Sequence, residues 1–282
     1  MKFFKSLPKL LKELNINNIP CTDFDAWYKY NKYHKIYNKL FIAESQDIES
    51  GPMGILPKKY PVIFKPIINL FGMSRGFSII RNKEEYFEKL QDGLFWMEYL
   101  DGEQYNLDLI LLNGEIKYYT CLKSKPYTEG TFEYHESLPN YTINNVIKDW
   151  IIKYFNKYTG CLNLEFINNK IIEAHLRLNG DYYLYDIDFT KELDNLYNNN
   201  KWNYYKKINK KYIIPVFCLE KINIEIEIII DILKNYKCTN LYIDNFNSSN
   251  QRENIKRLFM FECKDLKDGL NAKDDILDFY VK

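Results

Sequence analysis

The sequence has few of the features that build a covalent or thiolate framework. Its six cysteines are scattered along 282 residues, and no two of them form a Cys-x-x-Cys pair. This distribution argues against a disulfide framework and against a structural zinc site, because both need cysteines at matched spacings. We therefore expect free thiols and a reducing, cytoplasmic environment.

A long apolar run and a strong net charge are also missing. Three acidic residues interrupt the apolar stretch 222–233, which is too short to span a bilayer. Lysines break the apolar residues of positions 1–12, so this segment does not read as a signal peptide, and its helical spacing predicts a helix docked on the core. The net charge of +1 provides no general attraction to nucleic acid or to an anionic membrane. We expect a globular protein with no membrane partner.

What the sequence does contain is a succession of alternating apolar and polar segments. Asn113-Gly114 between two apolar runs predicts a β-hairpin, and a second hairpin is predicted across Asn168-Asn169. Residues 144–158 have the apolar spacing of an amphipathic helix, and residues 124–140 are interpreted as a long polar loop. The predicted strands are 60–66, 78–81, 94–100, 105–112, 115–121, 162–167 and 170–178, and another helix is predicted at 82–90.

These elements suggest three parts of an α+β protein. Residues 1–57 form an N-terminal helical and connecting segment, and residues 58–195 form the core. Residues 196–282 form a linker and a small α/β appendage. Its predicted order is a strand from Tyr212, a helix at 225–235, a strand at 240–243 and a helix at 251–259.

The most informative motif is a row of charged side chains on one predicted strand. Glu173, His175 and Arg177 are spaced two residues apart, so they point to the same face. The preceding strand of the hairpin carries Glu165. Two carboxylates on neighbouring strands can hold Mg²⁺, and a guanidinium beside them can stabilise a transferring phosphoryl group. The alternative interpretation is a solvated row of charges.

The register of this hairpin decides whether the carboxylates meet. With a plain two-residue turn at Asn168-Asn169, Glu165 lies opposite Ile172 and on the other face from Glu173. An odd-length loop, with a bulge at one asparagine, places Glu165 opposite Glu173. We predict the odd-length loop.

Two earlier motifs are suited to nucleotide binding. Lys65-Pro66 ends a predicted strand just before the glycine-containing loop 71–77, where a lysine and backbone amides can hold phosphate oxygens. Residues 98–100 end another strand, whose backbone can bond to adenine, and Glu103 can accept hydrogen bonds from ribose hydroxyls. Taken singly, these are also consistent with an ordinary turn carrying a surface lysine and with a hairpin carrying two solvated acids.

In this order, the three motifs resemble the ATP-grasp superfamily over about residues 37 to 190. The resemblance implies an ATP-grasp fold, in which two α+β subdomains clasp ATP, so that residues 58–195 would be the ATP-grasp core. It also implies an ATP- and Mg²⁺-dependent ligase, with Mn²⁺ as an alternative metal. Such an enzyme activates a carboxylate as an acyl phosphate for attack by an amine or a similar nucleophile. Its partners would be small-molecule carboxylate and amine substrates.

The same resemblance implies roles for individual residues. His175 stands where the family usually has asparagine, and an imidazole suits softer ions than Mg²⁺. The segment before Lys65 is also short for the substrate-binding domain of such enzymes. The implied roles are catalysis for Lys65 and Arg177, phosphate binding for Lys65 with the flap residues Gly72, Ser74, Arg75 and Gly76, nucleoside binding for Glu98, Tyr99, Leu100 and Glu103, metal binding for Glu165, Glu173 and His175, and the opening of the nucleotide domain for Tyr37-Asn38-Lys39.

Two other functions remain as alternatives. The substitution at His175 and the short N-terminal segment are also consistent with an ATP-binding sensor or partner-binding protein that has no turnover. Basic and aromatic residues interleave in segments 27–39 and 201–212, which is typical of single-stranded nucleic-acid binding, although a general excess of Lys and Tyr explains this better. His34 and His135 have no partner at catalytic spacing, and we expect both on the surface or in loops.

Overall fold

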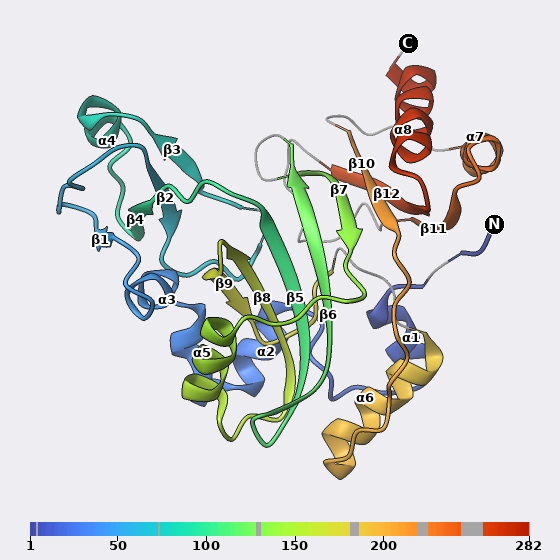
Figure 1. Cartoon of the computed structure of the whole chain (residues 1–282), viewed down its shortest axis with the longest axis horizontal. Helices are drawn as coiled ribbons and strands as arrows, with labels where there is room; N and C mark the ends of the chain where they lie inside the picture. The colour runs from blue at the N-terminus through green and yellow to red at the C-terminus, as the bar shows by residue number, and fades with distance from the viewer. Residues whose placement is uncertain are drawn as a thin grey trace.

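The computed structural model describes residues 1–3, 5–72, 74–127, 131–180, 186–218, 225–243 and 256–281. These residues form two antiparallel sheets (Figure 1). The smaller has the order β1-β4-β2-β3, and the larger has the order β11-β12-β10-β7-β6-β5-β8-β9. The small sheet and α4 lie at one end of the molecule, and β10 to β12 with α7 and α8 lie at the other (Figure 1). The α+β class is as predicted.

The strands follow the predicted alternation over most of the chain. Asn113 and Gly114 both have positive φ, of 52° and 83°, which is the conformation that a two-residue hairpin turn requires. The strands are β1 (Ser50–Pro52), β2 (Val62–Pro66), β3 (Ser78–Ile80), β4 (Leu94–Glu98), β5 (Gln104–Leu112), β6 (Glu115–Pro126), β7 (Phe132–Ser137), β8 (Gly160–Ile167), β9 (Lys170–His175), β10 (Tyr212–Cys218), β11 (Thr239–Ile243) and β12 (Lys256–Cys263).

Most of the helices pack on the large sheet, whereas α4 packs on the small sheet. None of the described helices is long and apolar enough to cross a bilayer. They are α1 (Leu7–Glu13), α2 (Asp23–Lys29), the 3₁₀ helix η1 (Asn31–Tyr37), α3 (Lys39–Glu44), α4 (Lys83–Glu88), α5 (Asn145–Phe155), α6 (Ile187–Asn199), α7 (Ile226–Asn235) and α8 (Leu266–Val281).

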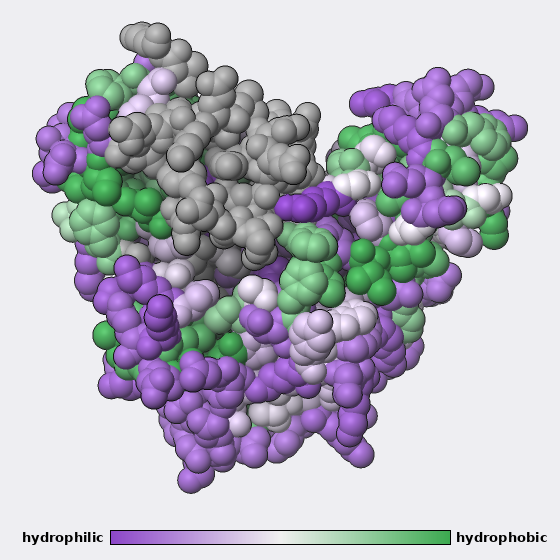
Figure 2. Space-filling model, turned by 180° about the vertical axis from the view of Figure 1, so that it is seen from behind, coloured by the Kyte–Doolittle hydropathy of each residue, from purple (hydrophilic) through white to green (hydrophobic). Residues whose placement is uncertain are grey.

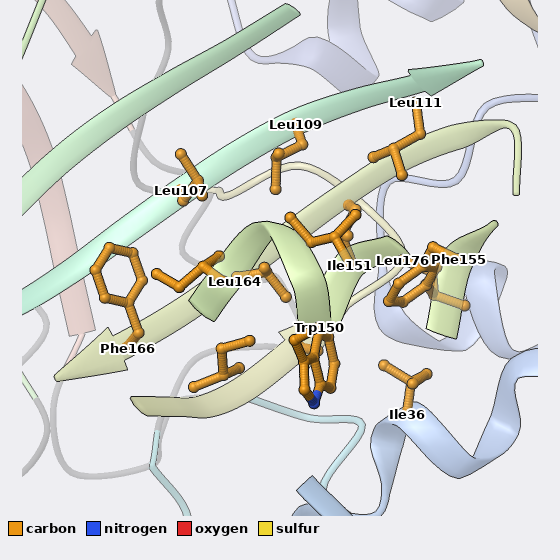
Figure 3. Packing of buried hydrophobic residues seen from close by; sticks show 14 of the residues in the cluster. Ile36, Leu107, Leu109, Leu111, Trp150, Ile151, Phe155, Leu164, Phe166 and Leu176 are labelled. Carbon is orange, nitrogen blue, oxygen red and sulfur yellow. The ribbon is translucent and has the colours of Figure 1, made fainter. Parts of the chain in front are cut away.

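The largest core cluster covers one face of the large sheet. Trp150, Ile151 and Phe155 of α5 lie among the leucines of β5 and β8, including Leu107 and Leu164 (Figure 3). The segments α2, η1 and α3 contribute to the same cluster. These segments come from the first 44 residues, so side chains of the N-terminal part contribute to the main core. Seen from behind, the coloured surface is mostly hydrophilic, with small groups of exposed hydrophobic residues (Figure 2).

A smaller apolar cluster joins the two sheets. Ile63 and Met97 of the small sheet pack with Ala43 of α3 and with Ile172 of β9. The side chain of Ile172 is 8% exposed. This cluster fixes the small sheet against the β8–β9 hairpin, which carries the predicted metal ligands.

Three secondary-structure predictions are wrong. Within the polar loop predicted at 124–140, residues 124–126 instead end β6 and residues 132–137 form β7, in which polar residues are buried on a sheet face. The helix predicted at 251–259 is strand β12 from Lys256 onward, and residues 251–255 lie outside the described residues. The linker predicted from residue 196 begins inside α6, and α8 was not predicted. His135, which we expected on the surface or in a loop, lies on β7 and is buried.

The C-terminal strands belong to the large sheet. Tyr212 and Ile213 of β10 pair with Glu136 and His135 of β7, so the sheet continues without a break into the proposed appendage. The division of the chain into three parts stays a prediction.

Candidate functional site

The face of the large sheet opposite α5 carries a buried polar row. Paired residues of neighbouring strands lie on the same face, and the registers connect β9, β8, β5, β6 and β7. Burying this many polar groups requires hydrogen bonds or a ligand. The buried members of the row are Asn106, Asp108, Thr120, Ser124, His135, Ser137, Asn163 and His175.

The register of the β8–β9 hairpin is the one that the charged motif needs. Glu165 lies opposite Glu173, as predicted. The reason given for it was wrong, because Ile167 pairs with Lys170 across a plain two-residue turn. The extra residue is Ile172, which forms a bulge inside β9 and packs into the cluster between the sheets.

Glu165, Glu173 and His175 come together at the end of this hairpin. Each offers one ligand atom, and these three atoms lie within 4.8 Å of one another. Nε2 of His175 is 3.5 Å from Oε2 of Glu173. Gln104 donates a hydrogen bond of 3.0 Å to Oε2 of Glu165 from the neighbouring strand β5. Two carboxylates and an imidazole nitrogen are a donor set that suits a divalent cation.

Two lysines face the same carboxylates. Nζ of Lys39, at the start of α3, lies 2.6 Å from Oε1 of Glu173, and Nζ of Lys65, on β2, lies 3.8 Å from it. Both lysine side chains are buried. The Lys65-Pro66 motif predicted Lys65 as a phosphate-binding residue of this site. For Lys39 the resemblance implied only a place at the start of the nucleotide domain.

The pKa values of these groups reflect burial and mutual charge. Burial and then the negative charge of Glu173 raise the pKa of Glu165. Burial would also raise the pKa of Glu173, but Lys39, His175 and Lys65 hold it well below its ordinary value. The pKa of Lys65 is lowered, chiefly by burial. The buried lysines and His175 therefore lie beside an ionised Glu173 and a Glu165 whose ionisation is disfavoured.

Asp23 connects the cluster to the N-terminal segment. Its Oδ1 lies 3.1 Å from Nδ1 of His175, and its Oδ2 accepts a hydrogen bond of 2.8 Å from Arg177. The carboxylate is only 3% exposed. A capping box between Thr22 and Asp25 fixes the start of α2 and therefore the position of Asp23.

Asp23 also changes the electrostatics of both partners. Burial would lower the pKa of His175, but Asp23 and the hydrogen bonds to it and to Glu173 raise that pKa to about 9. The pKa of Asp23 is lowered despite its burial, because Arg177 and His175 lie beside it. A carboxylate behind the Nδ1 of a histidine is the arrangement that commonly orients metal-binding imidazoles. Sequence reasoning missed Asp23, which lies 152 residues from His175 and in no recognised motif.

A second network, also missed, braces the chain after β9. Asp108 accepts hydrogen bonds from the backbone N–H of Asn179 at 2.8 Å and from Asn163 at 2.9 Å. Asn163 also donates to Asn106 and pairs with His175 in the sheet register. The sequence offered one signal for this network: Asn106 and Asp108 alternate on β5, and Asn163 lies on the next strand.

The remaining predicted residues lie in two groups outside the cluster. Glu98 forms an ion pair of 2.7 Å with Lys170, and Glu103 pairs with Lys123 and accepts from Tyr105. These residues stand at the connection between β4 and β5, with Tyr99 and Leu100 between them.

The loop after β2 contains the predicted flap. Gly72, Ser74 and Gly76 all have positive φ, and Gly76 lies so close to Pro66 that a Cβ would come within 2.8 Å of its ring. Arg75 lies over the ring of Phe71 at 5.2 Å. The structure thus brings Lys65 to the predicted metal ligands and pairs Arg177 with Asp23. The predicted flap residues follow the end of β2, and the predicted nucleoside residues follow the end of β4, which is antiparallel to β2.

The arrangement of the two sheets is shared with solved structures. An N5-carboxyaminoimidazole synthase from Aspergillus clavatus, in complex with ADP and 5-aminoimidazole ribonucleotide, matches with a TM-score of 0.61 at 9% identity, over 98% of this chain and 86% of that one. The chain has the ATP-grasp fold. An ADP complex of N5-carboxyaminoimidazole synthetase from Staphylococcus aureus matches this ATP-grasp chain with a TM-score of 0.60 at 12% identity, over 99% and 84% of the two chains.

A third structure extends the comparison to another kind of ligase. The L-amino acid ligase from Bacillus licheniformis matches with a TM-score of 0.57 at 10% identity, over 95% of this chain and 75% of that one. No protein-family model and no curated protein sequence matches the chain. The ATP-grasp fold suggested by the three short motifs is therefore confirmed by three-dimensional similarity at very low sequence identity.

Proposed function

We propose that the protein is an ATP- and divalent-metal-dependent ligase that activates a carboxylate for attack by an amine or a similar nucleophile. The observation that carries this proposal is the meeting of Glu165, Glu173 and His175 with two buried lysines between the sheets of an ATP-grasp fold. The structural neighbours named above support it, since they are ligases or synthetases of this fold and two of them were solved with ADP.

The residues of the cluster fit a divalent cation. Glu165 and Glu173 repel each other when both are ionised, and a cation between them would remove that repulsion. His175 would supply Nε2, while Asp23 holds Nδ1 and so orients the ring. When bound, the metal would supply charge neutralisation for the phosphates of ATP, with either Mg²⁺ or Mn²⁺ in this role.

The chain's own cations would bind and orient the phosphates. Lys65 and Lys39 are desolvated, so their charges act in a low dielectric and are strong there. In this proposal both lysines turn from Glu173 toward phosphate oxygens when ATP binds. Arg177, which we predicted near the transferring phosphoryl group, would contribute its charge from its place beside Asp23.

The nucleoside would lie at the β4–β5 connection. The backbone of Glu98, Tyr99 and Leu100 would bind adenine and Glu103 the ribose. Gly72, Ser74, Arg75 and Gly76 would form the flap beside the phosphates. The positive φ values of the first, second and fourth of these residues support a loop that brings backbone N–H groups close to a ligand.

The test is ATP turnover in the presence of acid and amine mixtures. We expect ADP release that depends on both the metal and an acid, and we expect Glu173→Gln to abolish it. As a matched control, Glu115→Gln alters an exposed glutamate on β6 and should leave turnover unchanged. Absence of acid-dependent ADP or AMP release across a broad panel would count against the proposal.

The second candidate function is ATP binding without turnover, in a sensor or partner-binding protein. The observation that favours it is that Asp23 contacts both His175 and Arg177. Each of these two side chains therefore already has a buried carboxylate partner within the protein. ATP binding that persists without metal and is unaffected by Glu173→Ala would select this candidate over the ligase.

A further inference from the structure

A pocket outside the charged cluster lies at the end of the small sheet. Its volume is about 430 Å³, which is in the range of sites for small organic ligands. Three segments line it, namely Phe24 of α2, residues of the loop after β2 (Pro66, 68–71, Arg75 and Gly76), and the residues from Gln91 to Leu94 that lead into β4.

The pocket adjoins the cluster through the chain. Phe24 directly follows Asp23, which contacts His175 and Arg177. Pro66 directly follows Lys65, whose Nζ lies 3.8 Å from Glu173. Two walls of the pocket are therefore anchored by residues of the candidate site.

Large apolar side chains around this pocket are exposed to solvent. Phe24, Ile68 and Phe71 are 36%, 45% and 47% exposed, although they come from two separate segments. The rings of Phe24 and Phe71 meet edge to face at 4.9 Å. Exposed apolar groups that gather around a concavity mark a ligand site, because covering them with an apolar group is favourable.

The wall of the pocket is held in a defined shape. Asn69 is buried, donates a hydrogen bond of 3.0 Å to the carbonyl of Gly72, and accepts one of 3.0 Å from the N–H of Phe71. Gly76 has a φ of 73° and packs against Pro66 at a distance that excludes a Cβ. These contacts define the backbone around Asn69 and Phe71 and keep Gly76 against Pro66.

The polar part of the lining includes a cation. The guanidinium of Arg75 lies 5.2 Å from the ring centre of Phe71, so a positive charge stands beside the apolar surface. Asp92 contributes a negative charge to the same lining. An occupant with a bulky apolar group and an anionic group matches Arg75 and the three apolar side chains.

The position also fits the acid to be activated. Leu94 lines the pocket, and Glu98 at the other end of β4 lies in the proposed nucleoside site. Four residue steps along a strand span about 13 Å. The pocket is therefore at the phosphate end of the proposed ATP site.

We propose that this pocket binds the apolar substituent of the carboxylic acid substrate, and that the substrate class is acids with an aromatic or branched apolar group. This inference rests on the proposed ligase function and adds the identity of the acid to it.

The test compares two acids and four forms of the full-length protein by isothermal titration calorimetry. The probes are 3-phenylpropionate and propionate, each titrated with and without a non-hydrolysable ATP analogue and Mn²⁺. We expect wild type to bind 3-phenylpropionate at least about tenfold more tightly than propionate, because the ring covers apolar surface. Phe71→Ala should remove most of this difference, and Ile68→Asp should also remove it.

Phe87→Ala is the matched control. Phe87 lies on α4, is 58% exposed and does not line the pocket, so its loss should leave the preference intact. Thermal unfolding of each variant checks that the fold is retained. A wild type that binds both acids equally, or a Phe71→Ala variant that keeps the preference, would overturn the inference.

The nucleotide titration separates this inference from the proposed function. If the ATP analogue binds but the aromatic acid is not preferred, the pocket assignment is wrong and the ligase proposal stands. If the analogue does not bind at all, the ligase proposal is wrong, and the titration without nucleotide still decides whether the pocket takes an apolar acid.

Discussion

At the scale of single residues, the site depends on compensated burial of charge. Glu173 is ionised because Lys39, His175 and Lys65 lie beside it, and Asp23 is ionised because of His175 and Arg177. Removing one member of such a network leaves its partner buried without compensation, which costs more than the pair itself contributes.

The substitution Asp23→Asn tests the positioning of His175. It keeps the size of the side chain but removes the negative charge behind Nδ1. We expect metal affinity to fall by about 10- to 100-fold, as for other groups that orient a metal-binding histidine. Calorimetric titration with Mn²⁺ measures this.

Asp231→Asn is the control for that substitution, since Asp231 is an exposed aspartate on α7, away from the cluster. It should leave metal affinity unchanged. Equal metal affinities of Asp23→Asn and wild type would show that Asp23 does not orient His175.

At the scale of elements, the bulge at Ile172 brings the carboxylates together. The residues before and after it pair in different registers, and a shift by one residue exchanges the two faces of a strand. The bulge also directs Ile172 into the cluster that joins the two sheets.

Insertion of an alanine between Ile172 and Glu173 should therefore abolish metal binding, because a second extra residue moves Glu173 out of register with Glu165. Ile172→Ala keeps the register and removes only packing, at about 2–5 kcal/mol, so it should lower the unfolding temperature but retain metal binding. Mn²⁺ titration and thermal unfolding distinguish the two variants. Retained metal binding in the insertion variant would mean that this register is not what brings Glu173 to Glu165.

The same element shows what sequence reasoning can and cannot reach. Alternation predicted β8 and β9 correctly, because each strand has one apolar face on the core. It placed the bulge in the turn, since the packing partners of Ile172, such as Ile63 and Met97, are distant in sequence. The strand β7 was missed because His135 and Ser137 are buried polar residues, which look like loop residues in a sequence. Asp23 was missed because its role appears only when α2 packs behind β9.

At the scale of the whole molecule, the large sheet unites the core with the C-terminal strands. The cluster formed by β10 to β12, α7 and α8 is distinct from the main core, yet β10 pairs directly with β7. The predicted boundary near residue 196 therefore separates two apolar clusters but does not interrupt the large sheet.

A chain truncated after residue 207 should be less stable than the full chain and should aggregate, because the edge of β7 would lose its partner. Thermal unfolding and size-exclusion chromatography measure both effects. A soluble truncated protein with unchanged stability would instead support an independent C-terminal unit.

The central claim is that Glu165, Glu173 and His175 hold a divalent ion that also contacts the phosphates of ATP. Pulsed electron paramagnetic resonance of the protein with Mn²⁺ and a non-hydrolysable ATP analogue tests it directly. The account predicts coupling of one Mn²⁺ to both phosphorus and an imidazole nitrogen, with the nitrogen coupling lost in His175→Gln. A spectrum without nitrogen coupling, unchanged by Glu173→Gln, would contradict it.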